Sequence, residues 1–373
     1  MGKKIAIVFA GQGAQYPGMG KSLYETSVAA RAVFEAAGDK ITRDCFEATQ
    51  EALNQTDVTQ PAVYTVDMAA WAAFAEALGI SEGAHSGRVG GEAKQSGWAA
   101  GKLDNADSAA DSAADSATVD IVGMAGFSLG EYAAFTASGI LPEVAAGIDL
   151  IKERGRLMAA AGRHGDGTPR GAMAAVLGAR DEILELVARA RGSWVLEAVN
   201  YNAPTQTVIA GDAEAIEAFS AAAKASGKKL RVMPLPVSTA FHSPIMAPAS
   251  EGIREAASKI AFGVPAYEVY LDMTGSALSA YLEEMDGGAA GGPDFSSIVP
   301  RIMAEQVKRP VKWQQITEAL VAVGAEVIVE FGPGKTLTGL AKKTAPGATA
   351  VNVQDAETLA TAIEAIRSSC SDS

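Results

Sequence analysis

A serine between two glycines, placed where a short apolar run meets a helix-forming stretch, constrains this chain more than any other feature. The apolar run 121–125 leads directly into Gly-Phe-Ser-Leu-Gly at 126–130. Glycines on both sides of a serine allow a sharp strand-to-helix turn that pushes the hydroxyl out of the sheet edge. The N-terminus of the following helix offers unpaired N–H groups to a developing negative charge. The pattern therefore predicts a nucleophile elbow with Ser128 at its tip.

The length and charge of the chain limit its partners. Its 373 residues can form two or three domains, or one large α/β domain with an insertion, and 48% apolar residues supply an ample core. The net charge of −13 argues against nucleic acid, whose phosphates need a basic surface, and against an anionic membrane. An anionic substrate would need a local cation in so acidic a protein.

The cysteines and apolar runs indicate the compartment. Cys45 and Cys370 give neither a disulfide framework nor a metal-ligand spacing, so two reduced thiols and neither metal nor cofactor are expected. The apolar stretch that follows Met1 is too short for a signal peptide, and none is long enough to span a bilayer. We therefore expect a soluble, cytoplasmic monomer.

The order of predicted elements divides the chain into a large α/β domain and a smaller inserted one. The buried-strand pattern at 5–10 is typical of a parallel sheet, and Thr59-Gln60-Pro61 is expected to begin a helix that runs to about Leu78. The order strand–helix–strand–strand–helix–strand over 166–236 is typical of a ferredoxin-like subdomain. An α/β-hydrolase-like domain with a parallel-sheet core would then comprise 1–165 and 237–373. Its expected later elements are helices at 142–161, 248–259 and 315–323 and strands at 268–273 and 326–331.

Two segments interrupt the large domain. Residues 81–118 are rich in Gly, Ala, Ser and Asp, and three short copies of one pattern begin at Asp107, Asp111 and Asp115. So few large apolar residues cannot offset the cost of ordering, so a flexible surface insertion is expected. A second, glycine-rich insertion lies at about 284–296.

A serine hydroxyl becomes a good nucleophile when a base takes its proton, and that base is usually a histidine. The chain has three histidines. His85 and His164 lie in glycine-rich, loop-like settings, whereas His242 lies in a loop of small residues just after the smaller domain. We therefore expect His242 to be the base. No single acid stands out as its partner, and a backbone carbonyl could orient the imidazole instead.

Several separate motifs occur in one order along the chain. They are FAGQGAQ at 9–15, TQPA at 59–62, GFSLGE at 126–131, ERGRLM at 153–158, NYNAP at 200–204, AFHS at 240–243, QVKRPVKW at 306–313 and GPGKTLTGL at 332–340. Together they resemble the malonyl-CoA:acyl-carrier-protein transacylases over most of the chain outside the two insertions. The resemblance implies transfer of malonyl from malonyl-CoA to the phosphopantetheine thiol of acyl carrier protein, through a seryl-malonyl intermediate, for fatty-acid synthesis.

The resemblance also implies the catalytic roles. Ser128 would be the acylated nucleophile and His242 its base. The backbone N–H groups of Gln12 and Leu129 would form the oxyanion hole. The backbone carbonyl of Gln306 would orient His242 in place of an acid.

The substrate-binding residues follow from the same resemblance. Arg154 would hold the free malonyl carboxylate in a bidentate pair, although its helix context alone predicts a solvated surface charge. Gln60 and Asn202 are expected to line the site, and Phe241 is the bulky residue that the family associates with malonyl. The chain departs from the family at Phe127, where histidine is common, and we expect a changed pocket with activity retained.

Two other classes of protein remain open at this stage. A serine esterase or thioesterase would share the elbow, but a conventional acid is not evident and Arg154 would be unexplained. A non-catalytic scaffold that binds acyl carrier protein would not need Ser128, His242 and Arg154 together.

Overall fold

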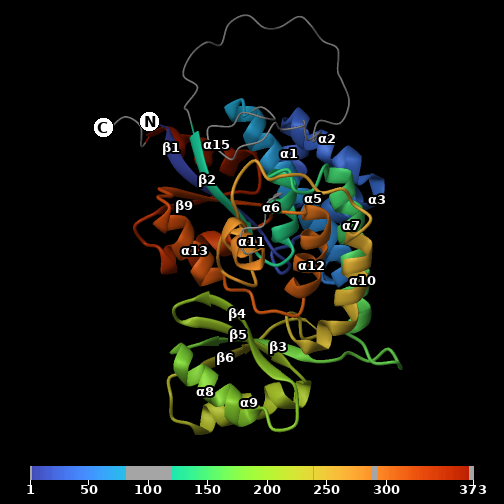
Figure 1. Ribbon diagram of the computed structural model, residues 1–373, viewed down its shortest axis with the longest axis vertical. Helices are drawn as coiled ribbons and strands as arrows, with labels where there is room; N and C mark the ends of the chain where they lie inside the picture. The colour runs from blue at the N-terminus through green and yellow to red at the C-terminus, as the bar shows by residue number, and fades with distance from the viewer. Residues whose placement is uncertain (1, 81–118, 238, 287–292, 369–373) are drawn as a thin grey trace, which may run out of the picture.

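The computed structural model describes residues 2–80, 119–237, 239–286 and 293–368. Within these ranges the chain forms a mixed α/β fold with one parallel and one antiparallel sheet, as Figure 1 shows. This confirms the predicted α/β class at that level. The predicted insertion at 81–118 lies outside the described residues, as do His85, Cys370 and the middle of the second insertion.

The larger part of the molecule is built on the parallel sheet. Its five described strands are arranged in the order β7-β2-β1-β8-β9. Alternate residues of β1 face two different cores: Ile5, Ile7 and Phe9 pack in one, and Ala6 and Val8 in the other. Both faces of the sheet are therefore covered, which explains the continuous apolar run of the first strand. The strands are β1 (Lys3–Phe9), β2 (Val119–Gly126), β7 (Val269–Tyr270), β8 (Val327–Phe331) and β9 (Thr349–Val353).

Helix α5 (Thr56–Leu78) covers one face of this sheet and is buried over most of its length. Its Trp71 and Phe74 pack against Phe331 of β8, with ring centroids 5.6 and 5.0 Å apart. The expected start of this helix was wrong, because Pro61 lies inside the helix and not in its first turn. The helix begins earlier, at Thr56. Proline is tolerated inside it because the missing N–H removes only one hydrogen bond of the helix.

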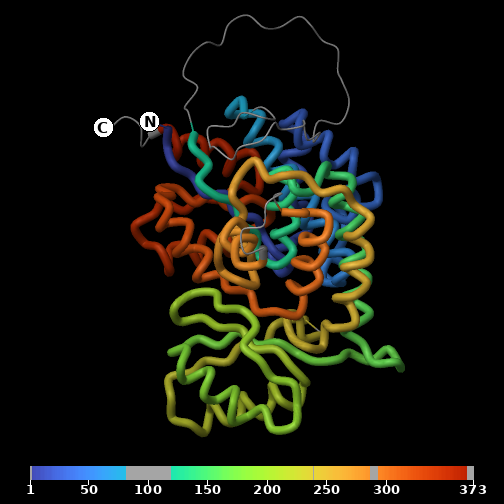
Figure 2. The backbone as a smooth tube through the Cα atoms, viewed as in Figure 1, coloured from blue at the N-terminus to red at the C-terminus, as the bar shows by residue number. Residues whose placement is uncertain are grey.

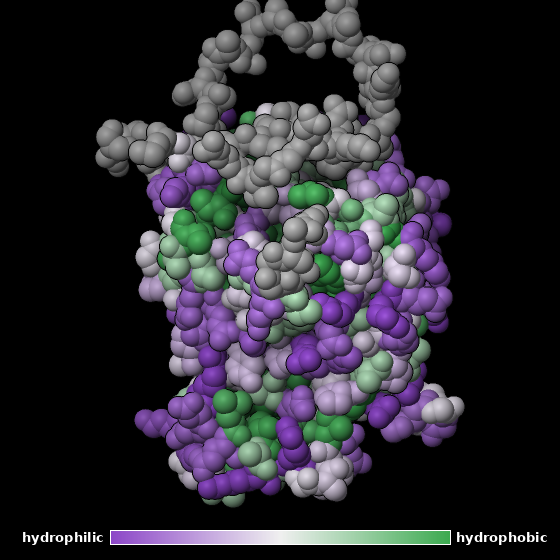
Figure 3. Space-filling model, viewed as in Figure 1, coloured by the Kyte–Doolittle hydropathy of each residue, from purple (hydrophilic) through white to green (hydrophobic). Residues whose placement is uncertain are grey.

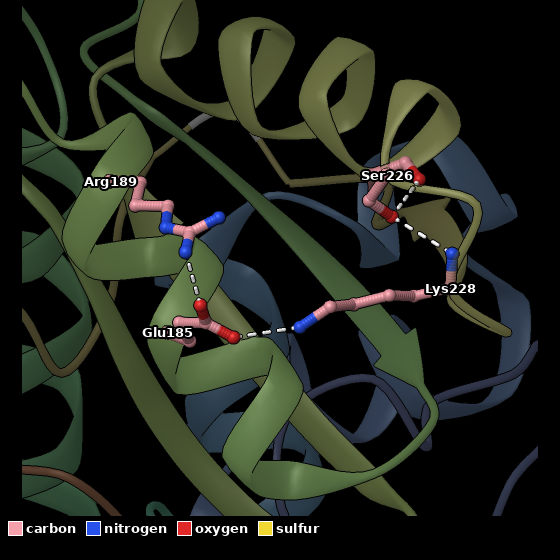
Figure 4. Close-up of polar contacts among 5 residues, drawn as sticks. Glu185, Arg189, Ser226 and Lys228 are labelled. Carbon is pink, nitrogen blue, oxygen red and sulfur yellow. Dashed lines mark hydrogen bonds and ion pairs between the residues drawn. The ribbon is translucent and has the colours of Figure 1, made fainter.

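The smaller part of the molecule comes from one continuous segment, coloured green to yellow in Figure 2, whereas both ends of the chain contribute to the larger part. Its antiparallel sheet has the order β4-β5-β3-β6 in the described residues. Figure 4 shows Glu185 of α8 between Arg189 and Lys228, with Lys228 Nζ 2.7 Å from the carboxylate. The elements are β3 (Ala172–Leu177), α8 (Arg180–Ala190), β4 (Leu196–Ala203), β5 (Gln206–Gly211), α9 (Ala213–Ala225) and β6 (Arg231–Pro234).

The remaining helices surround the parallel sheet. The helices between 21 and 53 were not among the expected elements. They are α1 (Lys21–Thr26), α2 (Val28–Ala37), α3 (Asp39–Glu47), α4 (Gln50–Leu53), α6 (Gly130–Ala137), α7 (Val144–Ala161), η1 (Pro244–Met246), α10 (Ala247–Ala257), α11 (Leu278–Asp286), α12 (Phe295–Gln306), α13 (Trp313–Ala322), α14 (Thr336–Thr344) and α15 (Ala356–Ser368).

Strand β7 is much shorter than the strand expected at 268–273. After Tyr270 the chain leaves the sheet in a turn, in which the Leu271 N–H donates to the Ser276 carbonyl and the Gly275 N–H to the Leu271 carbonyl. This turn carries Asp272 to the C-terminal end of β2.

The surface of the described residues is mixed. Figure 3 shows hydrophobic side chains on the visible face in separate patches among hydrophilic ones. In the described ranges, none of the helices combines the length and the apolar character needed to cross a bilayer.

Candidate active site

The serine predicted from the sequence lies at a sharp turn between β2 and α6. Ser128 has a backbone φ of 54°, in the left-handed region that residues with a Cβ rarely adopt. A Cβ on Gly126 would come within 1.9 Å of the Gly130 backbone, and one on Gly130 within 2.3 Å of the Phe9 carbonyl oxygen. Both glycines of the motif are therefore sterically required for the turn that exposes the Ser128 hydroxyl.

The imidazole of His242 lies against that hydroxyl. Its Nε2 is 2.7 Å from Ser128 Oγ, and its Nδ1 is 3.0 Å from the Gln306 carbonyl oxygen and 3.1 Å from the Arg309 carbonyl oxygen. Carbonyls only accept hydrogen bonds, so they select the tautomer with the proton on Nδ1. The free Nε2 lone pair then faces the serine. His164, in contrast, is exposed in a loop.

The ring of His242 is neutral at physiological pH. Burial, assisted by the nearby positive charge of Arg154, lowers the pKa of His242 from 6.5 to about 4, although the two carbonyls oppose this shift. A neutral imidazole can accept a proton from the serine, so the pair has the geometry and protonation state of a nucleophile with its base.

Arg154 is fully buried on α7, in contrast to the surface position that its helix context suggests. Its Nη1 donates to Gln60 Oε1 at 2.8 Å, and its Nη2 lies 3.2 Å from both Ser128 Oγ and Gln306 Oε1. The guanidinium lies over the Tyr132 ring, 5.1 Å from its centroid. No carboxylate in the described ranges lies within ion-pair distance of it, so a buried cation beside the serine can receive an anionic group.

A cavity of about 540 Å³ opens onto this cluster between the two sheets. The predicted Gln12, Gln60, Asn202 and Phe241 line it together with Ser128, Arg154 and His242. Leu129, also predicted, is buried behind the serine and immediately precedes α6. The remaining walls are largely apolar and include Phe127, Met158, Met173, Ala175, Val208, Leu235, Val237, Leu337 and Leu340.

Phe127 forms part of this wall, at the position where the family that the chain resembles commonly has histidine. Its ring packs against Trp313 with centroids 5.4 Å apart. The substitution therefore gives the cavity an apolar surface next to the nucleophile.

Two buried acids complete the site and were not predicted. Asp272 Oδ2 accepts a hydrogen bond from the Ser128 N–H at 2.6 Å, and Glu131 Oε1 accepts one from the Asp272 N–H at 3.0 Å. The Gln306 side chain joins them, because its Nε2 donates to Glu131 Oε2 and, at 2.7 Å, to the Ser128 carbonyl. Glu131 belongs to the elbow motif, but Asp272 follows an ordinary apolar run and carries no local signal.

A serine paired with a neutral histidine at a strand–helix elbow, beside a buried arginine, defines a class of site that can form and release acyl esters. Residues 6–117 and 118–367 match the family model described as acyl transferase domain. The chain belongs to this acyl transferase family.

Similar proteins match nearly the whole length of the chain. The malonyl CoA-acyl carrier protein transacylase of Escherichia coli K12 is 31% identical over 97% of this chain and 99% of its own, and that of Bacillus subtilis 168 is 32% identical over 98% of each. The crystal structure of the transacylase of that name from Clostridium perfringens superposes with a TM-score of 0.77 at 28% identity, over 98% of both chains. A malonyl-transacylase solved in complex with a type II polyketide acyl-carrier protein gives a TM-score of 0.76 at 28% identity, over 97% of this chain and 100% of that one.

Proposed function

We propose that this protein transfers the malonyl group from malonyl-CoA to the phosphopantetheine thiol of an acyl carrier protein, for fatty-acid synthesis. The relatives that match its full length are malonyl CoA-acyl carrier protein transacylases. The observation that carries the proposal is the buried guanidinium of Arg154, 3.2 Å from the Ser128 hydroxyl. A cation there selects an acyl group whose far end is a carboxylate.

The reaction proceeds in two half-reactions through one serine ester. Ser128 Oγ attacks the thioester carbonyl of malonyl-CoA while His242 Nε2 takes the hydroxyl proton. The C–S bond then breaks, and the proton passes from His242 to the departing CoA sulfur. In the second half-reaction His242 takes the proton of the carrier thiol and the sulfur attacks the carbonyl of the serine ester. The bond from the acyl carbon to Ser128 Oγ then breaks, and His242 returns the proton to the serine oxygen.

The negative charge that develops on the carbonyl oxygen needs donors. The backbone N–H groups of Gln12 and Leu129 fill this role in the proposal, because Gln12 lines the cavity and Leu129 immediately precedes α6. Loss of one such donor costs about 3 kcal/mol of transition-state stabilisation in other enzymes.

A serine hydrolase is the alternative that the site must be tested against. The ring of His242 is held by the carbonyls of Gln306 and Arg309, and no carboxylate contacts it in the described part of the chain. A hydrolase would also leave the burial of Arg154 unexplained. Both observations favour transfer.

We also propose a fold type for each of the two parts of the molecule. We assign 1–165 with 237–373 to an α/β-hydrolase-like domain and 166–236 to a ferredoxin-like subdomain. The element order β3-α8-β4-β5-α9-β6 and the antiparallel strand order β4-β5-β3-β6 support the second assignment.

Radiolabelled malonyl-CoA tests the function directly. With phosphopantetheinylated carrier protein, label should move to the carrier thiol; without it, label should remain on the enzyme. Rapid release of free malonate in the absence of carrier would instead indicate a hydrolase. The Ser128→Ala variant should transfer no label and serves as the background control.

A further inference from the structure

The backbone of the nucleophile is held by a side chain from another part of the chain. Ser128 lies between β2 and α6. Its N–H donates a hydrogen bond to Asp272 Oδ2 at 2.6 Å, and Asp272 lies in the turn after β7. Because Ser128 has a φ of 54°, its conformation persists only where the surroundings enforce it. The bond to Asp272 is one of the contacts that enforce it.

The two buried acids beneath the serine differ in how many of their carboxylate oxygens accept hydrogen bonds. Both oxygens of Glu131 accept hydrogen bonds, from the Asp272 N–H and from Gln306 Nε2. Asp272 Oδ1, in contrast, is buried and has no hydrogen-bond partner among the described residues. An ionised oxygen that is buried without a donor is costly, whereas a neutral one is much less so. The donors therefore favour an ionised Glu131 and a neutral Asp272.

The charges around the pair lead to the same assignment. The groups that act on Asp272 are Glu131 from α6, Arg154 from α7 and the Gln306 amide from α12, while the Lys312 contact is through its backbone N–H. Two ionised carboxylates would outweigh the one guanidinium and repel an incoming malonyl carboxylate. Burial raises the pKa of both carboxyls. For Glu131 the hydrogen bonds from the Asp272 N–H and Gln306 and the charge of Arg154 oppose the rise, whereas for Asp272 the charge of Glu131 reinforces it and the pKa lies well above its usual range.

Resting on the proposed function, we propose that Asp272 is a positioning residue that fixes the Ser128 backbone as a neutral carboxylic acid, while Glu131 stays ionised. The neutral acid keeps the elbow in its reactive geometry and leaves the charge of Arg154 available to the substrate. The role requires an acceptor oxygen at Oδ2 and no charge at Oδ1. Asparagine satisfies both requirements and alanine neither.

Three variants test this assignment through the rate of enzyme acylation by malonyl-CoA as a function of pH. Asp272→Ala should slow acylation about 100-fold, the cost of a misplaced reacting group. Asp272→Asn should recover the rate to within about 10-fold of wild type, since it keeps the bond to Ser128 N–H. The wild type should also lose rate at alkaline pH as Asp272 ionises, and Asp272→Asn should not show this fall. Glu131→Gln should be more impaired than Asp272→Asn, because its amide N–H₂ must face a donor.

Three results would overturn the proposal: Asp272→Asn as slow as Asp272→Ala, an unchanged alkaline fall in Asp272→Asn, or Glu131→Gln as the better tolerated variant. If the wild type is not acylated by malonyl-CoA, the proposed function fails. The protonation state of Asp272 is then tested separately, from the pH dependence of stability measured by urea unfolding. An acid that is neutral when folded and ionised when unfolded lowers stability as pH rises. The stability of Asp272→Asn relative to wild type should then increase with pH, and a pH-independent difference would overturn the assignment.

Discussion

Replacement of Arg154 by alanine should remove the preference of the enzyme for malonyl over acetyl groups. The guanidinium is buried and, in the described ranges, no carboxylate lies within ion-pair distance of it, so a substrate carboxylate would be its direct ion-pair partner. Removal of one member of a buried charge pair leaves the other uncompensated and costs about 3–4 kcal/mol, or roughly 10²–10³-fold in kcat/KM. An acetyl group has no carboxylate, so its transfer should not show this loss.

The assay compares acylation of the enzyme by malonyl-CoA and by acetyl-CoA, each from single-turnover rates over a range of concentrations. Arg156→Ala is the matched control, since Arg156 lies on the same helix but is exposed and paired with Glu153. Its selectivity should equal that of wild type. An equal decrease with both substrates in Arg154→Ala would refute the assignment, because it would show a structural defect and no carboxylate recognition.

Four further outcomes are expected. The acid limb of kcat/KM for acylation should have its midpoint near pH 4, where His242 becomes protonated, and a midpoint near 6.5 would contradict the buried, neutral ring. Because unfolded histidine takes up its proton first, His242 should also cost about 3 kcal/mol of stability as pH falls from 6.5 to 4, which is measured against His242→Gln. Gly130→Ala should destabilise the fold by about 3 kcal/mol in urea unfolding, whereas Gly339→Ala, with open space around its Cβ, should not. Phe127→His should keep transfer activity within about tenfold, and a complete loss would show that the Phe127–Trp313 contact is essential.

Local patterns were sufficient to predict much of the fold. The first strand, the elbow and the element order of the smaller part each depend on short-range periodicity and on glycine positions. The expected strand at 268–273 was too long, since hydropathy does not show that the chain turns away after Tyr270. The start of α5 was misplaced because Pro61 is tolerated inside a helix whose burial outweighs one lost hydrogen bond.

The site was predictable only where residues carry a chemical motif. Ser128 and His242 were expected together, and the structure brings them within 2.7 Å. Glu131 and Asp272 lie 141 positions apart in the sequence, and no local pattern shows that one accepts a hydrogen bond from the other. The burial of Arg154 is likewise set by tertiary packing, since its helix neighbour Arg156 has similar sequence surroundings and is exposed.

Mass spectrometry of the enzyme after brief exposure to malonyl-CoA tests most directly whether Ser128 carries the acyl group. The intact protein should gain the mass of one malonyl group, and proteolysis should locate that group on the peptide that contains Ser128. Addition of phosphopantetheinylated carrier protein should remove the adduct and load the carrier. An adduct that forms equally in Ser128→Ala, or transfer to the carrier without any acyl-enzyme, would contradict the proposed mechanism.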